Sequence, residues 1–194
     1  MGINMWWLQQ LDNQGVFRDS CSVLDIGSSN LYQASAESVS QFIRKWNPKL
    51  PAEDVGQISE KLAAGSAYIP GIGGINKAFA GELFEAAGMK YLSFDIANGY
   101  KTEILDMNRF ELPAHHREKF QAVLNFGTTE HIVNQINSFS VIHDAAATGG
   151  YIFHQLPSIG FVDHCYFTYT SRFFLDLAMA NEYELCDMSF GCGP

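Results

Sequence analysis

The sequence predicts an α/β protein in which a doubly wound, mainly parallel sheet carries helices on both faces. Apolar segments of strand length alternate with segments of helical periodicity along most of the chain. Several of the strand segments are apolar almost throughout, as expected when both faces of a parallel sheet are covered. Each of these segments also ends near a polar residue or a glycine. Parallel sheets bind ligands at the carboxyl ends of their strands, so these positions are the first candidates for a site.

The composition is typical of one folded domain. With 194 residues, 47% of them hydrophobic, the chain is long enough for a single domain (residues 1–194) with a substantial core. A net charge of −9 and the lack of a Lys/Arg run argue against nucleic acid or an anionic membrane as partner. No apolar stretch has membrane-spanning length, and the N-terminus does not resemble a signal peptide. The four cysteines form no CxxC pair, so we expect a cytoplasmic protein with reduced thiols.

The N-terminal half is expected to contain one strand and four helices. The strand is expected at residues 21–26, and the helices at 4–17, 35–46, 53–64 and 76–87. Pro48 and Pro51 end the second helix, and Gly88 stands where a left-handed C-cap ends the fourth. Residues 31–70 therefore form a helical insertion after the first strand, suited to a lid or to the interface of a homodimer.

The C-terminal half alternates more regularly. Strands are expected at 91–95, 102–106, 121–126, 150–155 and 183–189, and helices at 131–146 and 172–181. Strands separated by helices pair in parallel through right-handed crossovers, which places the first strand at the centre of the sheet.

The carboxyl ends of these strands predict one ligand-binding crevice, formed by Gly27, Asp95, Asp106 and Asn125. A glycine lets the backbone approach a ligand closely. The carboxylate of Asp95 can accept hydrogen bonds from both hydroxyls of a ribose, and that of Asp106 from an exocyclic amine. Asp25 is expected deeper, accepting backbone N–H groups of the loop that follows it. The alternative for each Asp is a helix cap or an ordinary loop residue.

Five short motifs follow one another in a recognisable order. They are Val-Leu-Asp-Ile-Gly at 23–27, Phe-Asp at 94–95, Leu-Asp-Met-Asn at 105–108, Asn-Phe-Gly-Thr-Thr-Glu-His at 125–131 and Thr-Gly-Gly at 148–150. This set resembles the class I S-adenosylmethionine-dependent methyltransferases, and most closely their small-molecule branch, in which a Glu-His pair follows the fourth strand. The resemblance covers roughly residues 22–190.

The resemblance implies a Rossmann-like methyltransferase sheet, S-adenosylmethionine as cofactor, and methyl transfer to an oxygen or nitrogen of a small-molecule acceptor. Gly27 would line the methionine end of the cofactor, and Asp95 would hold the ribose. The full set of implied cofactor-binding residues is Asp25, Gly27, Asp95, Asp106, Met107, Asn125, Phe126 and Gly127.

Three departures from the family pattern accompany this resemblance. Ser-Ser-Asn at 28–30 stands where the family has further glycines. A second glycine-rich segment, 71–74, either contacts the cofactor or is only a turn. The chain stops at Pro194 without the family's antiparallel last strand, so either that edge strand is missing or the chain is truncated.

The histidines supply the candidate chemistry. His131 is the preferred general base, with a helix cap as its alternative role, and His154 is the reserve. The aromatic loop 156–169 is expected to build the acceptor pocket from Phe161, His164 and Tyr166, although such aromatics often belong to the core. No recognised metal-binding motif occurs, and methyl transfer requires no metal, so none is expected.

Two other classes of function remain open. A noncatalytic S-adenosylmethionine-binding or scaffold protein would explain the altered glycine loop. An NAD(P)-dependent oxidoreductase would use the same crevice, but the chain lacks a full GxGxxG opening its first helix and a Tyr-x-x-x-Lys pair.

Overall fold

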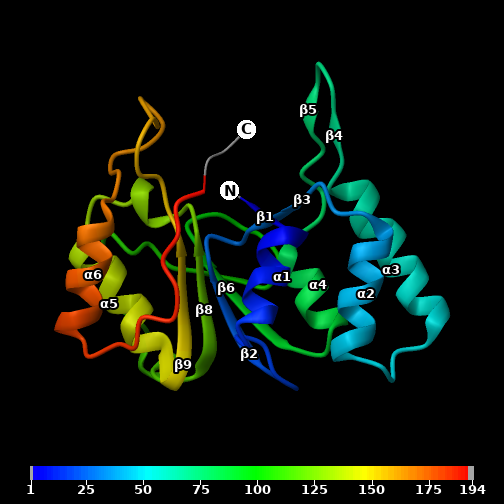
Figure 1. Cartoon of the computed structure of the whole chain (residues 1–194), viewed down its shortest axis with the longest axis horizontal. Helices are drawn as coiled ribbons and strands as arrows, with labels where there is room; N and C mark the ends of the chain where they lie inside the picture. Colours follow the sequence, from blue (N-terminus) through cyan, green and yellow to red (C-terminus); the bar gives the residue numbers. More distant parts are fainter. Residues whose placement is uncertain (1, 192–194) are drawn as a thin grey trace.

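The computed structural model describes residues 2–191 and is built around a five-stranded sheet in which every strand pairing is parallel (Figure 1). The spatial order of its strands is β7 (Thr102–Ile104), β6 (Lys90–Asp95), β2 (Ser22–Ile26), β8 (Phe120–Phe126) and β9 (Ala146–Gln155). Numbered along the chain, this is the order 3-2-1-4-5 of doubly wound nucleotide-binding sheets. The predicted parallel sheet and the central position of its first strand are confirmed.

Six α-helices and several short elements surround this sheet in the described part of the chain. The helices are α1 (Met5–Asn13), α2 (Ala36–Trp46), α3 (Ala52–Gly65), α4 (Ala80–Ala86), α5 (Gln135–Ala145) and α6 (Ser171–Ala180). Two 3₁₀ helices are η1 (Ala114–His116) and η2 (Thr129–His131). β1 (Gly2–Asn4) pairs in parallel with β3 (Asn30–Tyr32), and β4 (Tyr68–Ile69) forms an antiparallel hairpin with β5 (Gly73–Gly74).

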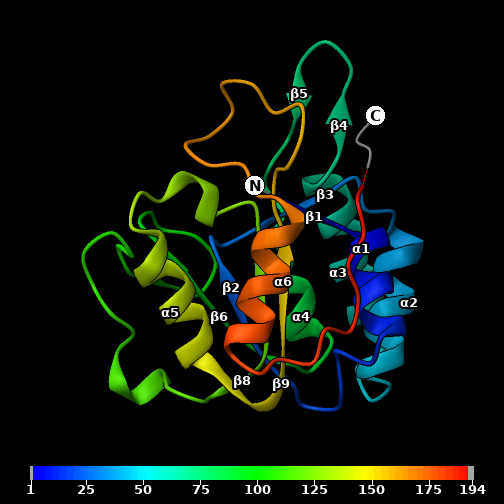
Figure 2. The same cartoon turned by 60° about the vertical axis from the view of Figure 1, so that its left-hand side comes forward.

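The sheet has a hydrophobic core on each face, because neighbouring residues of a strand point to opposite sides. Val23 belongs to the core that also contains residues of α1 to α4, whereas Leu24 and Ile26 belong to the core beneath α5. Figures 1 and 2 show α5 and α6 on one side of the sheet and α1 to α4 on the other. Helices therefore cover both faces, as predicted.

The helical insertion extends the first of these cores. Phe42 of α2 packs edge-on against Phe17 and Phe84, with ring centroids 5.8 and 6.4 Å apart. Val55 and Leu62 of α3 are buried in the same cluster. Only the β4–β5 hairpin projects from the insertion, at the end of the molecule to which the arrowheads of β8 and β9 point (Figure 1).

The predicted strand at 183–189 is wrong. Residues 183–191 follow an irregular path, and β9 is the last strand of the sheet. The segment carries Glu184 and Asp187, both exposed, and Asp187 accepts a hydrogen bond from Gln14 at 3.2 Å. Charged side chains at these positions do not suit a sheet whose two faces are covered by helices.

Three predicted helices are shorter than expected, for local reasons. α1 stops at Asn13 because Gly15 adopts φ +74°, after which Val16 and Phe17 enter the core. α4 begins only at Ala80, since Asn76 is left-handed and Phe79 is bridged to Asn30. α5 begins at Gln135, where the side chain of its N-cap residue Asn134 accepts from a backbone N–H.

Among residues 2–191, no helix combines the length and the apolar character needed to cross a membrane. Cys21, Cys165 and Cys186 are free thiols, and Cys192 lies outside the described residues.

Candidate functional site

The carboxyl ends of β2, β6 and β8 lie side by side and form the candidate site. Ile26 is in register with Phe94 on one side and with Asn125 on the other. Beyond the strand, the backbone N–H of Gly27 donates to the carbonyl of Phe94 at 2.8 Å. This bond brings the loop after β2 next to Asp95. The sheet reverses its strand order at β2, and ligands of doubly wound sheets bind at that point.

Asp25 is a buried anchor beneath this loop. Its carboxylate accepts from the backbone N–H of Ser29 at 2.7 Å, from the Ser29 hydroxyl at 2.9 Å and from the Tyr91 hydroxyl at 2.9 Å. Burial raises the pKa of Asp25, while the hydrogen bonds from Ser29 and Tyr91 oppose that shift. Asp25 thus fixes the loop from below, the deeper position that the sequence predicted for it.

The loop after β2 adopts left-handed backbone conformations although it contains serines in place of further glycines. Gly27 has φ +111° and Ser28 has φ +43°, and both are left-handed. The hydroxyl of Ser28 accepts from the backbone N–H of Tyr100 at 3.1 Å. A Cβ at Gly99 would lie only 2.1 Å from that hydroxyl oxygen, so the loop after β6 approaches closely because residue 99 is glycine. The other glycine segment, 71–74, lies in the β4–β5 hairpin, where Gly73 and Gly74 form β5.

Asp95 offers an unused acceptor at the carboxyl edge. Its Oδ1 accepts from the backbone N–H of Ala97 at 3.0 Å, whereas Oδ2 has no hydrogen bond or ion pair with the residues that the structure describes. Asp106 lies beyond the end of β7, where Oδ1 accepts from the Asn108 N–H at 3.0 Å and Oδ2 lies 3.5 Å from Arg109 Nε. Met107 is buried. Asp95 therefore fits a ligand hydroxyl more directly than Asp106 does.

Asn125 and Phe126 turn their side chains into the protein. The amide Nδ2 of Asn125 donates to Thr129 Oγ1 at 2.9 Å and pairs with His154 Nδ1 at 3.1 Å. The ring of Phe126 packs on Phe153, with centroids 4.9 Å apart. A ligand along this strand end would therefore meet backbone, near Gly127, rather than these two side chains.

His154 differs from the crevice-facing reserve base that the sequence suggested. Its ring packs against Phe139 of α5 and Phe174 of α6, each with centroids 5.4 Å away, and its Nδ1 is paired with Asn125. Burial lowers the pKa of His154 to about 4. The side chain therefore holds β8, β9 and the outer helices together as a neutral imidazole.

This neutral histidine predicts a specific loss of stability in acid. An unfolded histidine has a pKa of about 6.5, so His154 contributes full stability above that pH and loses it as the pH falls toward 4. The contribution should reach about 3 kcal/mol, since one pKa unit corresponds to about 1.4 kcal/mol. Urea unfolding between pH 7 and pH 4 measures it. His154→Gln should flatten the pH dependence in this window, and the exposed control His115→Gln should not. Identical slopes for all three proteins would contradict the assignment.

A second group of polar side chains surrounds η2, at the exit of β8. Glu130 is 1% exposed, its Oε2 has no hydrogen-bond partner among the described residues, and burial raises its pKa to about 7. His131 is half exposed, with Nε2 3.9 Å from Glu130 Oε1. Burial, and secondarily the neighbouring His164, lower the pKa of His131. Asn134 caps α5, so His131 does not have the helix-cap role that was its alternative.

The loop after β9 is fastened directly to this group. The carbonyl of Glu130 accepts from the N–H groups of Tyr166 and Phe167 at 3.0 and 3.2 Å, and the Tyr169 N–H closes the loop on the Pro157 carbonyl at 2.8 Å. These bonds bring His164 to His131, with ring centroids 5.3 Å apart.

Two further residues of this loop were predicted to line the acceptor pocket. The ring of Phe161 lies 5.6 Å from that of His164, and both Phe161 and Tyr166 are exposed. Their rings are therefore not part of the core, so the alternative that these two aromatics are core residues is wrong.

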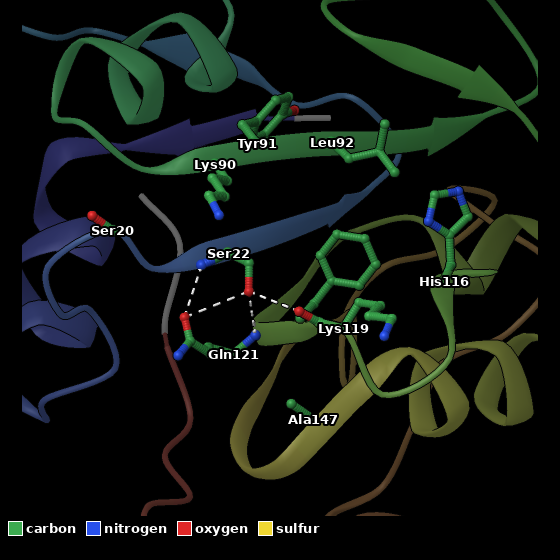
Figure 3. A pocket seen from close by; sticks show the side chains of 10 residues that line it. Ser20, Ser22, Lys90, Tyr91, Leu92, His116, Lys119, Gln121 and Ala147 are labelled. Carbon is green, nitrogen blue, oxygen red and sulfur yellow. Dashed lines mark hydrogen bonds between the residues drawn. The ribbon is translucent and has the colours of Figure 1, made fainter.

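Sequence reasoning missed a cavity at the other edge of the sheet. A hollow of about 610 Å³ opens at the amino ends of the strands, lined by Ser22, Lys90, Phe120 and Ala147 among others (Figure 3). Across it, the Ser22 N–H donates to the side-chain oxygen of Gln121 at 3.0 Å, and the Ser22 hydroxyl donates to the Lys119 carbonyl at 2.8 Å. This edge lies opposite the one at which doubly wound sheets bind ligands, so we do not assign the site there.

No protein-family model, curated protein or solved structure matches this chain. The class of protein is therefore the one that the structure itself shows, an α/β protein with a five-stranded parallel sheet in doubly wound order.

Proposed function

We propose that this protein is a class I S-adenosylmethionine-dependent methyltransferase that acts on an oxygen or nitrogen of a small-molecule acceptor. One observation carries the proposal. A loop anchored by buried Asp25 leads through left-handed Gly27 to the side of Asp95, at the reversal point of the sheet, and Asp95 Oδ2 has no partner among residues 2–191. A nucleotide-like cofactor needs such a combination of close backbone approach and a hydroxyl acceptor.

The residues present fit this cofactor in a definite arrangement. The backbone at Gly27 would face the methionine end, and Asp95 would accept from the ribose hydroxyls. Asp106 Oδ1 accepts one hydrogen bond, from the Asn108 N–H. A carboxylate has lone pairs for about four hydrogen bonds, so Asp106 can also accept from the adenine amine. Gly127 and its neighbours would supply backbone contacts to the cofactor.

The acceptor would be held between η2 and the loop after β9. S-adenosylmethionine, when bound, supplies an already activated methyl group, so the protein's task is to align the acceptor and to exclude water. Exposed Phe161 and Tyr166 offer ring surfaces to the acceptor. Burial lowers the pKa of His131, which favours the neutral imidazole, and its lone pair is offered beside them.

Replacing Asp95 tests the cofactor site. Asp95→Ala should weaken S-adenosylmethionine binding by about 1–3 kcal/mol, because two ribose hydroxyls lose a charged acceptor. Isothermal titration calorimetry measures the change, with exposed Asp54→Ala of α3 as the matched control. Unchanged affinity in a folded Asp95→Ala protein would remove Asp95 from the site.

A noncatalytic cofactor-binding protein is the second candidate. The observation that favours it is the inward orientation of Asn125 and His154, which leaves fewer reactive groups at the strand ends than the sequence suggested. Cofactor binding without formation of the demethylated product, across a panel of hydroxyl and amine acceptors, would favour this candidate.

A further inference from the structure

We propose that Glu130, His131 and His164 form a binding site for one divalent transition-metal ion, with Zn²⁺ as the best-fitting occupant. Each of the three side chains offers one ligand atom, and these atoms all lie within 4.8 Å of one another. Glu130 Oε1 is 3.9 Å from His131 Nε2, and the two imidazole rings meet at 66° with centroids 5.3 Å apart. Two imidazoles and one carboxylate are the ligand set of catalytic zinc sites that keep an open fourth position.

Glu130 provides an independent observation that points to a cation. Its side chain is 1% exposed, and Oε2 has no hydrogen-bond partner among the described residues. A buried carboxylate without a partner is unfavourable, because it loses its water without compensation. The contrast with Asp25 is direct, since that buried carboxylate receives three hydrogen bonds. A metal ion bound at Glu130 would give this carboxylate a cationic partner at close range.

Around the proposed site, hydrogen bonds hold the backbone in place, whereas the two histidine side chains can rotate. Hydrogen bonds from Tyr166 and Phe167 to the Glu130 carbonyl fasten the loop that carries His164. The ligand atoms of a tetrahedral zinc site lie about 3.3 Å apart, given zinc–nitrogen distances of about 2.0–2.1 Å. The present atoms must therefore approach one another by rotation of the two imidazoles. His131 and His164 are both exposed enough to rotate without disturbing the core.

A second group of similar composition does not share the decisive feature. Glu103, His115 and His116 also place three ligand atoms within 4.8 Å. There, however, Glu103 Oε2 is already paired with His116 Nε2 at 2.7 Å, and none of the three residues is buried. No buried carboxylate lacks a partner in this group, so we do not propose a cation there. The group therefore provides a control for the metal titration.

The metal site goes beyond methyl transfer and does not depend on it. If both proposals hold, the ion lies at the exit of β8, where the acceptor is expected. His131 would then be a metal ligand instead of a base, because one lone pair cannot serve both purposes. The open coordination position could bind the acceptor oxygen or nitrogen and favour loss of its proton.

Metal titration of the purified, tag-free full chain tests the site. After treatment with a chelator, the protein is titrated with Zn²⁺ against a chromophoric competitor, and with Co²⁺ while the visible absorption is recorded. We expect one equivalent of each ion to bind, with Co²⁺ bands of four- or five-coordinate intensity. Loss of an outer-shell partner alone weakens metal sites by about 10–100-fold, so His164→Ala and Glu130→Gln should each weaken Zn²⁺ binding by at least that factor.

His115→Ala is the matched control and should leave the titration unchanged. His164 is exposed, so its replacement should not impair folding, which circular dichroism checks. The proposal is overturned if the wild type binds no stoichiometric ion, if His164→Ala binds Zn²⁺ as the wild type does, or if His115→Ala loses the site. Calorimetry with S-adenosylmethionine on the same preparations reports separately on the proposed function.

Discussion

Under the proposed function, replacing His131 by alanine is expected to lower methyl-transfer turnover by about 10²–10⁴-fold, the range typical for a removed general base. The imidazole stands at the exit of β8 beside His164, and its side chain is partly exposed. Cofactor affinity should stay close to that of the wild type, because Gly27 follows β2 and Asp95 ends β6, whereas His131 belongs to η2. Formation of S-adenosylhomocysteine, with an acceptor found by screening, measures turnover.

The appropriate control is His143→Ala, an exposed histidine on α5 away from the carboxyl edge. A His131→Ala protein with near-normal turnover would return this residue to a structural role. Zinc titration of the same variant distinguishes its two chemical roles. If His131 is a metal ligand, the His131→Ala protein loses ion binding. If His131 is only a base, ion binding stays intact.

Asp25→Ala should destabilise the folded protein by about 2–6 kcal/mol, because the Ser29 N–H and the Tyr91 hydroxyl would be left buried without an acceptor at about 1–3 kcal/mol each. The loop that carries Gly27 depends on the same bonds, so cofactor binding should fail together with stability. Urea-induced unfolding followed by fluorescence gives the free energy of unfolding.

A graded variant keeps this prediction testable if Asp25→Ala does not fold. Tyr91→Phe removes one of the three hydrogen bonds and should cost about 1 kcal/mol while leaving both bonds from Ser29 in place. An Asp25→Ala protein as stable as the wild type would show that the carboxylate does not anchor the loop.

The sheet could be predicted from sequence because each strand carries its own apolar pattern, and several strands repeat that pattern. Strands such as 120–126 are buried along nearly their whole length and are therefore apolar throughout. The segment 183–189 shows the limit of that signal. Its apolar residues suggest a strand, but its charged residues keep it outside the helix-covered sheet. Helix starts were also displaced, since Asn76 and Asn134 act through backbone conformation and capping rather than through hydrophobic periodicity.

The position of a candidate site residue was predictable only where it follows from the end of the strand that carries the residue. Asp25, Gly27 and Asp95 follow from strand position, so their placement agrees with expectation. The inward turn of Asn125 and His154 depends on partners contributed by η2, α5 and α6, which no local pattern reveals. The meeting of Glu130 with His164 needs the closure of a long loop by backbone hydrogen bonds, for which the sequence carries no visible signal.

Calorimetric titration of the wild-type chain with S-adenosylmethionine, S-adenosylhomocysteine, NAD⁺ and NADP⁺ tests the central claim most directly. The proposed function predicts that both S-adenosyl compounds bind with one site per chain and that neither nicotinamide cofactor binds. A folded protein that binds neither S-adenosyl compound, or that binds a nicotinamide cofactor instead, would contradict it.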